Sequence, residues 1–311
     1  MTWTCCFCGC TDANRPKRWC PRCGTVQVSV DTRHKYEVLG KYCHPLSLIM
    51  RNHGIPHYFV DACAGSGIVQ GWDDKPADGS PLIMAKTREH VDGKIKDKGR
   101  DEESKCVFIE YDHKTFAALV KNTEPYQSYC TRIRGDANEV LPVQLATVVK
   151  DAFALIYIDP FGMGDPVIKF ETVKQVLERK RTELFIHFSL EAVERSAGML
   201  QHVDSDDSTL RAKARGSVNT LDLYMNGQEW RDVWTRSRSP SERRRELMDL
   251  YLTSLQRYYP HVQHMAIPIG EDNPETYLVF TTRNETGSKI MSNIMDKARR
   301  DGAESIARWF G

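Results

Sequence analysis

Short apolar runs alternate along this chain with stretches in which apolar residues recur every three or four positions. Apolar runs bounded by turn residues predict buried strands, and the recurring spacing predicts helices. The strands predicted in this way cover residues 58–60, 106–110, 129–133, 153–158 and 184–189. The helices between them cover residues 34–52, a stretch beginning at Pro81, a stretch after residue 110, and residues 139–149. Strands that alternate with helices indicate an α/β fold built on a parallel sheet.

The last third of the chain follows a different pattern. Residues 190–256 are predicted to form a long helical insertion. Two further apolar runs, 264–269 and 276–281, are separated by turn residues and predict an antiparallel hairpin. A final helix is predicted over 287–300. The whole pattern therefore predicts a mostly parallel sheet with an antiparallel last strand.

An acid and two glycines follow the first buried strand in the spacing D-x-x-x-G-x-G. They are Asp61, Gly65 and Gly67. Glycines at the carboxyl end of a strand let the backbone turn sharply and approach a ligand closely, and this edge of an α/β sheet is where ligands bind. The alternative is an ordinary structural turn, because Gly-x-Gly is common in loops.

Composition limits the class of protein more than it defines it. The 311 residues are 41% hydrophobic and 27% charged, with a net charge of +1, so any nucleic-acid surface must be local. No apolar run approaches the roughly 18 residues of a membrane span, and no signal-peptide core is present. We therefore expect a cytoplasmic protein with no membrane partner.

Six of the ten cysteines lie within the first 23 residues. Four of them form two C-x-x-C-G pairs: Cys5, Cys8, Cys20 and Cys23. This spacing predicts a structural four-cysteine zinc ribbon over residues 1–30, with Cys6 and Cys10 as spare thiols. A disulfide pair and an iron–sulfur cluster are the alternatives. Residues 31–311 would then form the α/β domain.

Basic side chains gather in two stretches. Residues 1–35 carry six basic and two acidic side chains, and residues 209–249 carry nine basic and six acidic ones. With tryptophans between them, both could bind phosphates and stack on bases. The alternatives are a ribbon that docks on its own domain and a solvated helix face.

Three later strands also end in candidate site residues. Glu110 stands where an acid bonds the ribose of S-adenosylmethionine (SAM) or NAD, although it lies 43 residues after Gly67 rather than about 20. Asp136 is placed either to accept the adenine amino group or to cap the following helix. Asp159, Pro160 and Phe161 could meet an acceptor and stack on a base, or form a plain turn.

The ordered set of these motifs resembles the three-Cys-motif partner family, over residues 34–300. The motifs that carry the resemblance are His34–Leu39, Asp61–Gly67, Gly79–Leu82, Phe108–Asp112, Gly135–Asn138, Ile158–Gly162 and Ile290–Met295. The family is similar to SAM-dependent methyltransferases, so the resemblance implies a Rossmann-like class I methyltransferase sheet. It implies a cofactor site made of Asp61, Ala62, Gly65, Ser66, Gly67, Glu110, Tyr111, Asp136 and Ala137. It also implies a three-cysteine, radical-SAM-like companion protein.

Two departures from related patterns bear on the substrate. Amino-methyltransferases carry an Asp/Asn-Pro-Pro-Tyr/Phe loop, whereas Asp159-Pro160-Phe161 has one proline. Phe188-Ser189 stands where family members often show Asn-Phe. The leading hypothesis is a SAM-dependent methyltransferase acting on nucleic acid, RNA or DNA, through Asp159, Pro160 and Phe161. The alternative is a non-catalytic nucleic-acid- or protein-binding partner built on a degenerate methyltransferase fold.

Overall fold

The structure is a computed structural model. It describes residues 3–4, 11–12, 26–27, 30–70, 76–94, 105–160, 166–267 and 276–310. The chain divides into two compact units: Met1–Ile158 together with Lys289–Gly311, and Asp159–Ser288. Each unit is described by itself.

Four parallel strands form the sheet of the first unit. They are β4 (His57–Asp61), β7 (Cys106–Glu110), β8 (Cys130–Arg134) and β9 (Phe153–Ile158), in the order β9-β4-β7-β8. Every residue of β4 and β7 is buried, as expected for parallel strands covered on both faces. Read from β8, the chain order is 3-2-1-4, the order of the first four strands of a Rossmann fold.

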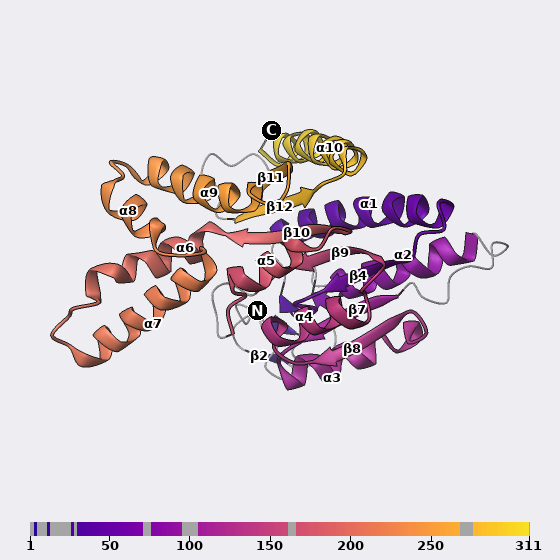
Figure 1. Cartoon of the computed structure of the whole chain (residues 1–311), viewed down its shortest axis with the longest axis horizontal. Coiled ribbons are helices and arrows are strands. Elements are labelled where there is room, and N and C mark those ends of the chain that lie inside the picture. Colours follow the sequence, from indigo (N-terminus) through magenta and orange to yellow (C-terminus); the bar gives the residue numbers. More distant parts are fainter. Residues whose placement is uncertain are drawn as a thin grey trace. The chain divides into compact units, whose positions relative to one another are not determined.

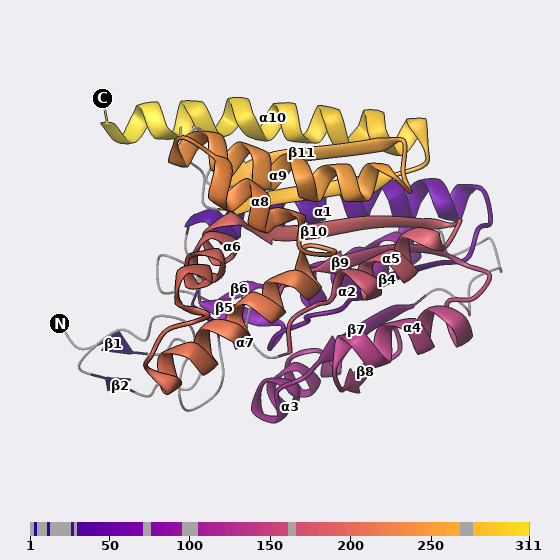
Figure 2. The same cartoon turned by 60° about the vertical axis from the view of Figure 1, so that its left-hand side comes forward.

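Helices flank this sheet. The first unit contains α1 (Val30–Asn52), α2 (Ser80–Lys94), α3 (His113–Asn122), η1 (Glu124–Tyr126), α4 (Ala137–Thr147) and most of α10 (Glu285–Phe310). Helices α1 and α2 pack together, α2 also packs on β4 and β7, and α3 and α4 pack on β7 (Figure 2). Helix α1 continues through Pro45, although a proline inside a helix removes one backbone hydrogen bond. Burial of Tyr42, Cys43 and Leu46 around the proline explains why the helix persists.

Short strands outside the main sheet were not predicted. β5 (Ile68–Gln70) follows the glycine loop and pairs antiparallel with β6 (Pro76–Asp78). β3 (Val26–Gln27) adds in parallel to β5, so backbone pairing joins the N-terminal segment to the glycine loop. β1 (Trp3–Thr4) and β2 (Thr11–Asp12) form a separate antiparallel pair.

The second unit combines an antiparallel sheet with helices. β10 (Thr182–Ser189), β11 (His261–Ile267) and β12 (Thr276–Thr282) run in the order β11-β12-β10. Its helices are α5 (Phe170–Glu178), α6 (Leu190–Ala197), η2 (Gly198–His202), α7 (Ser208–Tyr224), α8 (Glu229–Arg236) and α9 (Pro240–Gln256) (Figure 1). The buried ring of Tyr224 stacks on Phe188 and on Tyr251 where β10, α7 and α9 meet, and the rings of Phe188 and Tyr251 are tilted against each other.

The two units together confirm the predicted α/β class. The first unit supplies the parallel strands, and the second supplies the antiparallel strand pair at the end of the strand series. None of the described helices is both long and apolar enough to span a membrane.

Candidate functional site

The loop after β4 is tied to the neighbouring strands by its backbone. The N–H of Ala62 donates to the carbonyl of Tyr157 in β9, and the N–H of Ala64 donates to the carbonyl of Ile109 in β7, both at 2.9 Å. Asp61 is fully buried, and its Oδ1 accepts the N–H of Cys63 at 3.1 Å. These bonds hold the loop at the carboxyl edge of the parallel strands, which is the edge predicted for a ligand.

The two glycines of this loop have different surroundings. Both have left-handed backbone angles, with φ of 62° at Gly65 and 78° at Gly67. A Cβ on Gly65 would meet no atom within 4 Å, whereas one on Gly67 would lie 3.5 Å from the side chain of Leu119. Gly65 therefore faces open space, and Gly67 faces α3.

Gly79, which directly precedes α2, supports the same loop from another side. Its N–H donates to the carbonyl of Gly67 at 2.8 Å, and a Cβ there would lie only 2.9 Å from that oxygen. A side chain at residue 79 would push the two backbones apart. This contact explains why the Gly79-Ser80-Pro81 motif belongs to the site although it lies twelve residues beyond Gly67.

The buried carboxylate of Glu110, the last residue of β7, holds the glycine loop. Its Oε2 accepts the N–H of Gly65 at 2.9 Å, and its Oε1 accepts the N–H of Asp112 at 2.8 Å. Burial raises the pKa of this carboxyl above its usual value, although hydrogen bonds from the backbone N–H groups of Asp112, Gly65 and Tyr111 oppose the shift. A carboxylate has about four acceptor positions, so these bonds leave capacity for a ligand hydroxyl.

The loop after β8 joins the same group of residues. The N–H of Gly135 donates to the backbone carbonyl of Glu110 at 3.1 Å. Asp136 caps α4 by accepting the N–H of Asn138 at 2.8 Å, and Ala137 is buried as the first residue of that helix. Capping was one of the two roles predicted for Asp136. Tyr111, beside Glu110, leaves 60% of its surface exposed.

Asn122 is a supporting residue that the sequence did not reveal. Its Nδ2 donates to the carbonyl of Ser66 at 2.8 Å, from the last position of α3. Ser66 is buried, and its hydroxyl donates to the carbonyl of Ile68 at 2.6 Å. Nothing in the local sequence around Asn122 marks it, because its partner lies 56 residues earlier in the chain.

The predicted acceptor residues belong to the second unit. Asp159 directly follows β9 in the chain, and its Oδ1 lies 2.9 Å from Nδ1 of His187 in β10. Pro160 is described, whereas Phe161 lies outside the described residues. The sequence predicted His187 only as part of a strand. The feature that could have drawn attention to it is its position as the one polar residue within the apolar run Leu184–Phe188.

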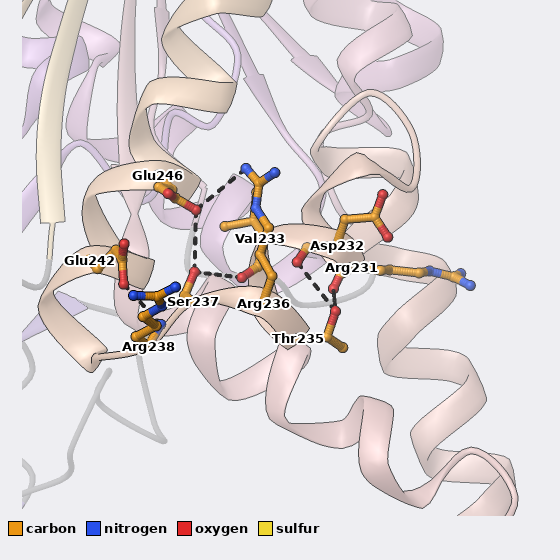
Figure 3. A network of polar contacts seen from close by, with 9 residues as sticks. All are labelled: Arg231, Asp232, Val233, Thr235, Arg236, Ser237, Arg238, Glu242 and Glu246. Atoms are coloured by element: carbon orange, nitrogen blue, oxygen red, sulfur yellow. Dashed lines mark hydrogen bonds and ion pairs between the residues drawn. The ribbon is translucent and has the colours of Figure 1, made fainter.

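The basic segment 209–249 is largely engaged in contacts within its own unit. Six of its nine basic side chains have partners there: Arg211, Arg215, Arg231, Arg236, Arg243 and Arg244. Figure 3 shows Glu246 meeting both Arg236 and the hydroxyl of Ser237. For the side chains of Lys213, Arg238 and Arg245, no described residue provides a comparable contact.

The four predicted zinc ligands, Cys5, Cys8, Cys20 and Cys23, lie outside the described residues. Strands β1 and β2 flank residues 5–10 in the chain. The described residues themselves contain no cluster of histidine, cysteine or acidic side chains that could hold a metal ion.

Comparison with known proteins shows likeness in fold only. No family model and no curated protein matches the chain. Similar solved structures include protein LPL1258 from Legionella pneumophila, 9% identical over 84% of this chain and 91% of its own, with a TM-score of 0.47. The O-methyltransferase TomG from Streptomyces achromogenes, solved in complex with SAM, is 12% identical over 79% of each chain, with a TM-score of 0.38. Spermidine synthase from Thermotoga maritima is 9% identical over 86% of this chain and 65% of its own, with a TM-score of 0.43.

At these identities and TM-scores, the functional argument rests on the site itself. The structure defines an α/β protein with a Rossmann-like strand order in its first unit and a glycine loop held by a buried acid at the carboxyl edge of that sheet.

Proposed function

We propose that this protein is a SAM-dependent methyltransferase, with SAM bound across Gly65–Gly67 and its ribose on Glu110. One observation carries the proposal: the carboxylate of Glu110 holds the N–H of Gly65 at 2.9 Å. This contact supports the proposal because it sets a carboxylate, which can accept hydrogen bonds from ribose hydroxyls, beside a glycine whose Cβ direction is open. The 43-residue gap along the chain is thus no obstacle, because the structure brings the two motifs together.

The surroundings of the other predicted cofactor residues are compatible with SAM binding. The exposed ring of Tyr111 follows the ribose acid directly and could cover a base by stacking. Asp61, Ala62 and Ser66 are buried and shape the loop, and Asp136 and Ala137 begin α4 next to Glu110. When bound, SAM would supply an electrophilic methyl group. The chain would then have to align an acceptor with that group, since methyl transfer is an in-line displacement governed by positioning.

We also propose that the acceptor is nucleic acid and that the segment Asp159-Pro160-Phe161 meets it. Lys213, Arg238 and Arg245 support this proposal because they are the basic side chains left for phosphates in the described part of segment 209–249. The net positive stretch over residues 1–35 and a zinc held by Cys5, Cys8, Cys20 and Cys23 remain part of it. So does a three-cysteine, radical-SAM-like companion protein.

The direct test is transfer of a labelled methyl group from SAM to total RNA and total DNA. We expect incorporation into one of them by the wild-type protein. A folded protein that binds nucleic acid but transfers no methyl group, even with the companion protein present, would favour the non-catalytic partner instead.

A further inference from the structure

A small three-stranded sheet joins the N-terminal segment to the glycine loop inside the first unit. Its strand order is β3-β5-β6, with β3 parallel to β5 and β6 antiparallel to it. Val26 and Gln27 of β3 lie opposite Val69 and Gln70 of β5. β5 is therefore the central strand, with backbone pairing on both sides.

The hairpin of β5 and β6 begins and ends in the candidate cofactor site. Gly67 directly precedes β5, and Gly79 directly follows β6. The N–H of Gly79 donates to the carbonyl of Gly67 at 2.8 Å. The hydroxyl of Ser66 donates to the carbonyl of Ile68, the first residue of β5, at 2.6 Å. A displacement of β5 would therefore move the backbone that is proposed to meet SAM.

Two other contacts that hold the hairpin are modest. Val69 is buried and packs against Tyr36 of α1. Asp78 of β6 pairs with Lys86 of α2, but both side chains are exposed, and an exposed ion pair contributes little to stability. A two-stranded hairpin is marginally stable on its own, whereas a third strand gives a sheet that can persist. We therefore expect pairing with β3 to fix the position of β5.

Pairing of β3 with β5 and binding of SAM to the loop should favour each other. SAM on the glycine loop would order the backbone that continues into β5, so that β3 pairs with a strand already in place. Conversely, a β5 held by β3 reduces the ordering that SAM binding requires. By linkage, each event strengthens the other by the same factor.

We propose that β3 is a positioning element for the cofactor loop, and that its pairing with β5 regulates the affinity for SAM. This inference rests on the proposed binding of SAM across Gly65–Gly67. With β3 paired, the loop is held in the geometry that binds SAM. With β3 separated, β5 becomes an edge strand, and the loop loses that support. The N-terminal segment thus acts on the cofactor site through the backbone of β5.

The first test replaces both residues of β3 in the full-length chain. Val26→Pro combined with Gln27→Pro removes both backbone N–H donors of the strand. The matched control, Val26→Thr combined with Gln27→Thr, keeps both donors and has side chains that favour strands. In calorimetric titrations, we expect the proline variant to bind SAM at least about fivefold more weakly, the lower end of usual coupling between sites. The threonine variant should bind SAM as the wild type does.

The outcomes separate the coupling from the cofactor site itself. Equal SAM affinities for the proline variant and the wild type would overturn the coupling. So would an equal loss in the threonine variant, because backbone pairing would then not be the cause. A wild-type protein that binds no SAM would overturn the proposed cofactor site, and the coupling with it.

The second test needs no variant, so misfolding of the proline variant cannot obscure the result. Hydrogen–deuterium exchange is measured in the wild-type protein with and without saturating SAM. We expect SAM to slow exchange in peptides covering β3 as well as in peptides covering β5. A strand that only supports the fold would not respond to the cofactor, so unchanged exchange at β3 in SAM-saturated protein would overturn the proposal.

Discussion

Glu110 joins three segments of the site, and the raised pKa of its carboxyl should affect ligand binding measurably. It accepts the N–H groups of Gly65 and Asp112, and its backbone carbonyl accepts that of Gly135. Ribose hydroxyls would donate to its charged form. Burial raises its pKa above the usual 4.5, so the charged form disappears at a higher pH than for an ordinary glutamate.

We therefore expect SAM affinity to fall as the pH decreases through this raised pKa, beginning above pH 4.5. Calorimetric titrations with SAM at a series of pH values measure the effect. Glu171→Gln serves as the control, because that exposed carboxylate lies on α5 in the second unit, where it pairs with Lys174. An affinity that is constant down to pH 4.5 in folded protein would show that Glu110 does not bind the ribose.

A substitution at Gly65 tests the open part of the site most directly. A Cβ there meets no protein atom within 4 Å, so Gly65→Ala should enter the space proposed for SAM without displacing the chain. The left-handed backbone, with φ of 62°, adds a strain of about 1–2 kcal/mol. We expect SAM affinity to fall at least tenfold, about 1.4 kcal/mol, as measured by calorimetry.

The matched control is Gly54→Ala, which has the same kind of backbone angle, with φ of 63°, in an exposed turn before β4. It should carry a similar strain and leave SAM affinity unchanged. Equal SAM affinities for Gly65→Ala and wild-type protein would place the cofactor elsewhere.

At the scale of residues, the sequence predicted which residues form the site better than it predicted which residues they contact. Strand-end acids and glycines could be found because they follow apolar runs, and Glu110 and Gly65 do meet. Asn122 and His187 were missed as site residues because their contacts join segments far apart in the chain. The direction faced by Gly67, toward α3 and not toward the ligand space, depends on three-dimensional packing that no local pattern records.

At the scale of elements, a buried polar network joins α1, β4 and α2. Ser47 Oγ lies 2.8 Å from Nε2 of His57, and Arg88 Nη1 lies 3.2 Å from the same nitrogen. Arg88 and Arg51 both pair with Asp92. Burial, assisted by the charge of Arg88, lowers the pKa of His57 to about 3. The ring is therefore neutral in the folded protein at neutral pH.

This network predicts acid sensitivity. In unfolded chains His57 binds a proton below about pH 6.5, whereas in the folded protein it stays neutral until about pH 3. The free energy of unfolding should therefore decrease by about 2 kcal/mol between pH 7.5 and 5. Urea unfolding at the two pH values measures it.

Comparison with a variant isolates this histidine from other titrating groups. In His57→Gln the amide oxygen can still accept from Arg88, and the pH dependence should shrink by that amount. Asp92 shifts in the opposite sense, because burial raises its pKa, so it cannot account for a loss of stability on acidification. The same decrease in wild type and His57→Gln would refute this assignment.

The elements themselves were largely predictable. Residues 106–110 and 153–158 form strands with the predicted bounds, because fully buried parallel strands produce continuous apolar runs. β5 and β6 were missed, because strands of three residues, one of them containing Pro76, lack a period long enough to recognise. Helix α1 continues past Pro45 because packing outweighs the local effect of proline.

At the scale of the whole molecule, the net charge is a poor guide to nucleic-acid binding, and the contacts of the individual basic side chains are more informative. Most of the arginines in segment 209–249 are held in ion pairs, stacked on Trp234 or bonded to backbone carbonyls. Arg244 pairs with Glu194 across α9 and α6, so its removal would also loosen the helices. The informative variant for nucleic-acid binding is therefore one that leaves these pairs intact.

We expect the triple variant Lys213→Gln, Arg238→Gln and Arg245→Gln to weaken RNA binding and to flatten its dependence on salt. For every phosphate that the variant no longer neutralises, the slope of log K against log[salt] should decrease in magnitude by about 0.7–0.9. RNA binding is measured at salt concentrations between roughly 50 and 200 mM, a range in which phosphate contacts change the affinity strongly. The control Lys174→Gln, whose side chain pairs with Glu171 on α5, should retain the wild-type slope. An unchanged slope in the triple variant would exclude this segment as the nucleic-acid surface.

The central claim is that SAM binds to the glycine loop held by Glu110, and calorimetric titration of the wild-type protein with SAM tests it most directly. The site predicts saturable binding of one SAM per chain, accompanied by a higher melting temperature, because a ligand that binds only the folded state stabilises it. A folded protein that gives neither heat nor a shift in melting temperature with SAM would contradict the claim.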